Sequence, residues 1–128
     1  MKLNVDCVRD VLLEFESLPI GNYSEHSFPD SIQKHGLENV CYTLLKLSEA
    51  QYINAEFIRT MDGRAHTVNL YDISFSGHQF LELIRDSTIW AKTKRIAGSV
   101  GSSGFGLISQ VAASILSDLA NSHLRNLP

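Results

Sequence analysis

Apolar residues recur at three- and four-residue steps in two early segments, which is the pattern of a helix with one buried face. The first predicted helix runs from Asp6 to Leu18, with Asn4 as its N-cap and Pro19 marking its end. The second predicted helix runs from about Leu37 to Ala50. The apolar stripes consist of Val8, Val11, Leu12, Phe15 and Leu18 in the first helix, and of Val40, Cys41, Leu44, Leu45 and Leu47 in the second.

Two segments rich in β-branched and aromatic residues follow the second helix and predict strands, Asn54 to Thr60 and Ala65 to Ile73. Between them, the segment Met61-Asp62-Gly63-Arg64 contains the Asp-Gly pair that favours a tight hairpin turn. Further upstream, the polar stretch Gly21 to Asp30 predicts a loop. Ser31 to His35 fits either a short strand or a helical turn.

After the hairpin, Ser76-x-x-Gln79 has the form of a capping box and predicts the start of a helix that continues towards Lys94. The segment Gly98 to Gly106 is rich in Gly and Ser, which predicts a flexible hinge. A last amphipathic helix is predicted from about Phe105 to His123. The apolar residues of the helix after the hairpin recur on or near one face and are Phe80, Leu83, Ile84 and Trp90.

The order helix, helix, β-hairpin, helix is that of a winged helix. We therefore predict an α+β fold, a winged helix-turn-helix-like domain with a β-hairpin wing and two additional C-terminal helices. The expected organisation is a winged-helix-like domain over residues 1–97, a Gly/Ser hinge over 98–106, and a C-terminal amphipathic helix over 107–124 that serves packing or dimerisation. A chain of 128 residues has the size of one domain.

The net charge of −3 is unevenly distributed along the chain. Residues 1–73 contain six Lys/Arg and eleven Asp/Glu, a balance of −5, whereas residues 74–128 contain five and three, a balance of +2. Because DNA affinity comes largely from neutralised phosphates, the acidic first part counts against a strong autonomous DNA binder. The chain has neither a twenty-residue apolar run nor a signal-peptide pattern, so a cytoplasmic protein without membrane insertion is expected.

The second helix and the wing hold the candidate DNA-binding residues. In a winged helix, this second helix enters the major groove, where Asn, Thr and Lys side chains can contact bases or phosphates. Glu38 and Glu49 on the same helix oppose that hypothesis, and an ordinary solvated helix face remains the alternative. The candidate residues are Asn39, Tyr42, Thr43 and Lys46 of the helix, and Arg59, Arg64 and His66 of the wing.

Other polar clusters favour structural explanations. The basic run from Lys92 to Arg95 could follow a phosphate backbone, but cations in the last turn of a helix also complement its dipole. No histidine lies at metal-ligand spacing from another ligand, and no nucleophile or phosphate-loop motif occurs, so neither an enzyme nor a bound cofactor or metal is expected. Cys7 and Cys41 fall at or beside apolar helix positions, which favours reduced, buried thiols.

The last helix carries an apolar stripe that must pack on something, because an isolated helix is marginal in water. The stripe can pair with a second copy, fold back on its own chain, or lie on a membrane surface, and the first of these is favoured. The candidate oligomerisation residues are Leu107, Ile108, Val111, Ile115 and Leu119.

Three segments resemble one family, the bacterial and phage proteins grouped as domain of unknown function 2513. They are MKLNVDCVRDVL at the start, VCYTLLKLSEAQYI from Val40 to Ile53, and the segment from Asp72 to Lys94 with its IRDSTIWAKTK portion. The resemblance covers most of residues 1–97 and implies a winged-helix-like fold and an association with prophages. Gln51 departs from the family, which commonly has Gly there, so it must accept a left-handed backbone or reshape the turn.

Two functions are consistent with these features. The favoured hypothesis is a small cytoplasmic accessory protein of prophage type that binds double-stranded DNA or regulates transcription as a homodimer. The alternative is a non-enzymatic protein-interaction module that keeps the winged-helix shape without binding DNA. Its acidic first half would then bind a basic host or phage protein.

Overall fold

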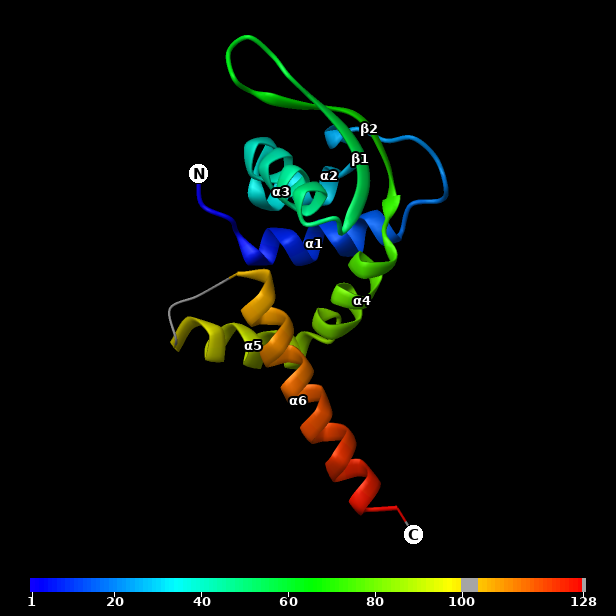
Figure 1. Cartoon of the computed structure of the whole chain (residues 1–128), viewed down its shortest axis with the longest axis vertical. Coiled ribbons are helices and arrows are strands. Elements are labelled where there is room, and N and C mark those ends of the chain that lie inside the picture. The colour runs from blue at the N-terminus through cyan, green and yellow to red at the C-terminus, as the bar shows by residue number, and fades with distance from the viewer. Residues whose placement is uncertain (100–103, 128) are drawn as a thin grey trace. The chain divides into compact units, whose positions relative to one another are not determined.

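The computed structural model describes residues 1–99 and 104–127, and these form two compact units, Met1–Leu81 and Glu82–Pro128 (Figure 1). The first unit ends within α4. The elements in chain order are α1 (Val5–Glu16), the 3-10 turn η1 (Glu25–Ser27), α2 (Pro29–His35), α3 (Leu37–Glu49), β1 (Ile53–Arg59), β2 (Ala65–Ile73), α4 (Phe75–Ile84), α5 (Ser87–Ser99) and α6 (Phe105–Arg125).

The core of the first unit lies between α1, α3 and the hairpin. The predicted N-cap of α1 is confirmed, because the Asn4 side chain accepts a hydrogen bond from the backbone N–H of Cys7 at 3.2 Å. Most of the apolar stripes predicted for α1 and α3 is buried, as is Leu70 of β2, whereas Leu18, Cys41 and Leu45 are half-buried. The buried residues of the two helices are Cys7, Val8, Val11, Leu12 and Phe15 in α1, and Val40, Thr43, Leu44 and Leu47 in α3.

The segment that fitted either a strand or a helical turn is helical. Pro29 occupies the first turn of α2, where a missing N–H costs nothing. The remaining N–H groups at that end bond to a side chain of another helix, because the Glu14 carboxylate of α1 accepts from Asp30 N at 3.1 Å and from Ser31 N at 2.9 Å. Glu14 therefore joins α1 to the start of α2.

The predicted hairpin is confirmed. Strands β1 and β2 pair antiparallel from Ile53↔Ile73 to Arg59↔Ala65, and Gly63 adopts a φ of 83° in the turn between them. On its other side, β2 forms an isolated bridge with Tyr23, whose backbone exchanges two hydrogen bonds of 2.9 Å with Leu70. The segment between α1 and α2 thus contributes a short extended piece to this two-stranded sheet.

The helix predicted after the hairpin is two helices. The cap is Ser74 and not Ser76, because the Ser74 hydroxyl accepts from Gly77 N at 3.1 Å. The prediction also missed a break at Asp86, whose carboxylate accepts from Thr88 N and Ile89 N, both at 2.9 Å, and starts α5. Within the described residues, three helices therefore follow the hairpin, where two were predicted.

In the second unit, α5 and α6 pack against each other as a helical pair (Figure 1). Their buried residues are Ile89, Trp90, Thr93 and Ala97 of α5, and Ile108 and Ala112 of α6. Of the predicted hinge, Gly98 and Ser99 belong to α5, and Phe105 and Gly106 belong to α6. Residues 100–103 of that hinge lie outside the described part of the chain. The fold is thus α+β, as predicted at that level.

Gln51 adopts the left-handed backbone, with a φ of 63°, at the turn between α3 and β1. That conformation strains any residue with a Cβ, by roughly 1–2 kcal/mol. We therefore expect Gln51→Gly to raise the free energy of unfolding by roughly 1 kcal/mol, because glycine adopts positive φ without that strain. Urea denaturation measures the change. Gln51→Ala is the control and should give no gain; an equal gain from alanine would contradict the backbone explanation.

Candidate nucleic-acid interface

Two of the predicted DNA-binding residues of α3, Tyr42 and Lys46, form a cation–ring contact. Lys46 Nζ lies 5.3 Å from the centre of the Tyr42 ring and 2.9 Å from a Glu49 carboxylate oxygen. The hydrogen bond to Glu49 raises the pKa of Lys46, and the nearby positive charge of Arg59 opposes that rise. Helix α3 packs against β1, so Lys46 and Arg59 belong to neighbouring elements.

The hairpin tip is a tightly bonded turn that exposes Arg64. The Asp62 carboxylate accepts hydrogen bonds from the Thr60 hydroxyl and, at 3.0 Å, from Arg64 N, and these two bonds hold the pKa of Asp62 below its usual value. Arg59 donates to the Gly63 carbonyl at 3.2 Å across the same turn. The Arg64 side chain is 80% exposed and lies 3.8 Å from Asp62, a distance at which an exposed ion pair adds little.

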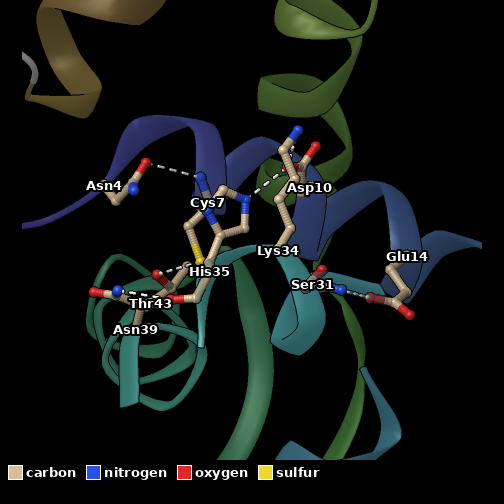
Figure 2. A network of polar contacts seen from close by, with 9 residues as sticks. All are labelled: Asn4, Cys7, Asp10, Glu14, Ser31, Lys34, His35, Asn39 and Thr43. Atoms are coloured by element: carbon tan, nitrogen blue, oxygen red, sulfur yellow. Dashed lines mark hydrogen bonds and ion pairs between the residues drawn. The ribbon is translucent and has the colours of Figure 1, made fainter. Parts of the chain in front are cut away.

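Two of the predicted base-contacting residues do not face solvent. Thr43 is only 1% exposed, and its hydroxyl donates to Cys7 Sγ at 3.2 Å in the interface between α3 and α1 (Figure 2). The prediction for Thr43 was therefore wrong, because the helical repeat places it beside Val40 and Leu47 on the buried stripe. Asn39 is half-buried, and its amide donates to the His35 carbonyl at 2.8 Å. The Thr43 hydroxyl is therefore withdrawn from solvent, and the Asn39 amide is partly engaged within the protein.

A polar network joins α1 to α2 (Figure 2). His35 Nε2 lies 2.7 Å from an Asp10 carboxylate oxygen, and Lys34 Nζ lies 3.3 Å from the same atom. The His35 side chain is only 7% exposed. Asp10 of α1 therefore helps to position α2. The network thus fixes α1 and α2 relative to each other, and α3 follows α2 directly in the chain.

A groove of about 630 Å³ separates the first half of α3 from the start of β2 and from η1. Its walls hold three of the predicted residues, Tyr42, Arg64 and His66, so the structure brings these together. The other lining residues are Met1, Glu25, His26, Leu37, Glu38, Cys41, Leu45 and Ala65. The groove thus combines an apolar floor with carboxylates and cations at its rim.

Glu25 and Glu38 make one end of this groove electronegative. Burial raises the pKa of the Cys41 thiol, and the negative charges of Glu25 and Glu38 raise it further. Glu25 is held in place by β2, because its carboxylate accepts a hydrogen bond from the Thr67 hydroxyl. Both cysteines are free thiols, as predicted, and burial also raises the pKa of Cys7. Neither thiol is therefore activated as a nucleophile.

The negative charges beside Cys41 are expected to slow alkylation of its thiol. Glu38→Gln removes a charge that opposes thiolate formation, so it lowers the pKa of Cys41, and alkylation of Cys41 near pH 8 should be several-fold faster. Mass spectrometry after iodoacetamide treatment follows Cys41 separately from the buried Cys7. Glu49→Gln, about three turns from Glu38 at the other end of α3, is the matched control. Equal acceleration by both variants would contradict the proximity of Glu38 to the thiol.

Sequence reasoning missed most of the groove, because it assigned Cys41 and Leu45 to the core stripe of α3. The two residues are only half-buried and line the groove instead. The sequence did contain one indication of the groove. Leu37, Cys41 and Leu45 recur at four-residue steps, so the apolar surface of α3 is wider than the part that packs against α1. Glu25 could not be linked to this site from sequence, because it lies in the segment predicted as a loop.

The predicted oligomerisation stripe is divided by the structure. Ile108 is 2% exposed within the α5–α6 pair, so it cannot also contact a second copy. Leu107, Val111 and Ile115 are half-buried, whereas Leu119 is 50% exposed. At Ile108, therefore, the stripe packs within its own chain.

Over residues 1–99 and 104–127, no three His, Cys, Asp or Glu side chains are grouped so as to hold a metal ion. No helix in these ranges is long and apolar enough to cross a bilayer.

Comparison with known proteins identifies relatives but no solved structure. The family model described as "Hypothetical protein (DUF2513)" matches residues 2–103, which confirms the predicted resemblance. A protein of Haemophilus influenzae, named only "Uncharacterized protein", is 29% identical over 120 residues, which cover 93% of this chain and 98% of that protein. No solved structure matches the chain.

Proposed function

The chain belongs to the DUF2513 family, and from that membership and the geometry of its first unit we propose that it is a winged-helix accessory protein that contacts duplex DNA. On this proposal it acts by binding and not by catalysis. The contact is made to phosphates by Lys46, Arg59 and Arg64, with little reading of bases. The protein then serves as a prophage-type accessory factor for DNA-bound machinery.

The order of elements supports the winged-helix assignment. Helix α1 is followed by a short extended piece at Tyr23 that pairs with β2, then by α2, α3 and the hairpin. In a winged helix, the third helix and the hairpin wing approach the duplex together. Fold order alone does not establish function, so the proposal depends on the side chains of these two elements.

The packing of α3 against β1 is the observation that carries the proposal. It places the cation of Lys46 on an element next to the hairpin, which carries the exposed Arg59 and Arg64. The carboxylate that pairs with Lys46, Glu49, is 49% exposed, and so weak an ion pair can be released when a phosphate binds. Because Thr43 and Asn39 are held by internal hydrogen bonds, base recognition is not supported. Phosphate contact without strong sequence preference follows.

Salt dependence tests this proposal directly. Fluorescence anisotropy with a mixed-sequence duplex, between about 25 and 200 mM salt, should show log affinity falling with log salt at a slope of about −2.7 for three phosphate contacts. Arg64→Ala should reduce the slope by about 0.9. The matched control is Lys34→Ala, which removes a cation that pairs with Asp10 of α1. An unchanged affinity after combined Lys46→Glu and Arg64→Glu would contradict the site assignment.

A second function is favoured by the charge of the first unit. Met1–Leu81 contains six Lys/Arg and eleven Asp/Glu, a balance of −5, and its groove has an electronegative end. These features support a protein-interaction module that keeps the winged-helix shape without binding DNA. Absence of DNA binding at the lowest salt would favour this second function over the first.

A further inference from the structure

We propose that the groove between α3 and the hairpin binds the exposed basic face of α5 from a second copy of this chain, and that two such contacts close a dimer. This inference does not depend on the DNA-binding proposal. It rests on the groove in the first unit, on the exposed face of α5 in the second, and on their opposite charges.

The groove suits a partner that inserts one apolar side chain and carries cations beside that side chain. Leu37, Cys41 and Leu45 of α3 form its apolar part, and Leu37 remains 41% exposed. Glu25 and Glu38 line the same groove as Cys41. A partner that fits this groove therefore carries positive charge and an apolar anchor.

The exposed face of α5 has this composition. Lys92, Arg95 and Ile96 lie at steps of three and four residues and so share one face of the helix. Ile96 is 45% exposed, and Lys92 and Arg95 are exposed as well. The opposite face of α5 is buried against its own unit. Among residues 1–99 and 104–127, no ion pair involves Lys92 or Arg95.

Charge balance favours a second copy as the occupant. The first unit has a balance of −5, and the second, Glu82–Pro128, has five Lys/Arg and three Asp/Glu, a balance of +2. Two copies related by a two-fold axis can each place α5 in the groove of the other, so both contacts are satisfied and the assembly closes. Ile96 then covers the apolar floor, while Lys92 and Arg95 pair with Glu38 and Glu25.

Charge reversal and exchange test this assembly. Sedimentation equilibrium at low salt should show a dimer, and the Glu25→Lys/Glu38→Lys variant should dimerise at least about tenfold more weakly, because like charges then face each other. The Lys92→Glu/Arg95→Glu variant should weaken dimerisation to the same extent. Mixing the two variants should restore the dimer, because both contacts of the mixed pair again join opposite charges.

The control replaces two carboxylates of the first unit outside the groove. Glu16→Lys/Glu56→Lys changes the net charge by the same amount and should leave dimerisation unchanged. Circular dichroism melting of each variant establishes that it is folded. A monomer at every concentration, or reversal variants that dimerise like the wild type, would overturn the proposal. So would a mixture of folded variants that stays monomeric. DNA binding is measured separately, by anisotropy on the wild-type chain, so failure of this contact is distinguishable from failure of DNA binding.

Discussion

Replacement of Gly77 by alanine should destabilise the first unit by at least about 3 kcal/mol, the upper end of the range for overpacked positions. A Cβ at this position would lie 1.9 Å from the Tyr52 carbonyl oxygen and 2.6 Å from Ile73 Cγ2. Real Cβ atoms do not approach backbone atoms so closely, so the chain must shift. Urea denaturation followed by circular dichroism measures the loss.

The Tyr52 carbonyl cannot simply move away from the new methyl group. It accepts a hydrogen bond from Ser74 N at 3.0 Å, and the Tyr52 ring stacks on Phe80 of α4 with ring centres 4.8 Å apart. Moving the carbonyl therefore weakens the hydrogen bond at the start of α4 and the ring contact together. The first turn of α4 and the end of the α3–β1 turn must approach closely, and glycine permits this.

Gly98→Ala is the matched control for this substitution. Gly98 lies in α5, and a Cβ there would meet nothing within 4 Å. Alanine should therefore stabilise the protein by roughly 0.5–1 kcal/mol through helix propensity alone. If Gly77→Ala changed the free energy of unfolding by less than about 0.5 kcal/mol, the close approach of α4 to Tyr52 would be wrong.

The long helices of this chain were predictable because each has a buried apolar stripe, and the strands because of their β-branched and aromatic residues. The helix predicted from Leu37 to Ala50 ends one residue earlier, at Glu49, and the strand predicted from Ala65 to Ile73 has those bounds. The hairpin turn followed from Asp62-Gly63, since glycine supplies the positive φ that the structure shows at Gly63. In such segments, local pattern and tertiary packing favour the same structure.

Helix caps were harder to locate, because several serines compete for one position. Ser76 matched the capping-box spacing, yet Ser74 forms the cap, and its hydroxyl also donates to the Gln51 carbonyl at 2.6 Å. That second bond involves a residue far away in sequence, so no local pattern indicates it. The break at Asp86 was missed for another reason, since Phe80, Ile84 and Trp90 approximate one helical stripe although they lie in two helices.

Sequence reasoning identified the charged residues of the candidate site but not which of its polar side chains are exposed to solvent. Lys46, Arg59 and Arg64 are near or at the surface, as sequence reasoning expected. Thr43 was misplaced because its polarity outweighed its position at helical steps from Val40 and Leu47, and its partner, Cys7 Sγ, lies in α1. A hydroxyl that bonds internally can be buried at little cost, which hydropathy does not register. Burial of short polar side chains therefore limits how well a contact surface can be predicted.

The largest loss of stability from a single truncation is expected at Phe28, in a segment predicted to be a polar loop. Phe28 has 0% exposure, and its ring meets Phe15 of α1 edge-on, with centres 5.4 Å apart and planes at 86°. Phe28→Ala should lower the free energy of unfolding by about 3–5 kcal/mol through lost burial and the cavity that remains. The measurement is chemical denaturation of the full chain.

Phe75→Ala provides the comparison, because it removes the same side chain from a site that is 77% exposed. Its cost should stay within about 0.5 kcal/mol. Phe28 also supplies the carbonyl that accepts from Ile32 N at 2.9 Å, so its ring holds the start of α2 against α1. Loss of the ring should therefore loosen α2 and the Asp10–His35 contact before the rest of the unit unfolds. Hydrogen exchange at α2 that stays as slow as in the wild type would contradict this order.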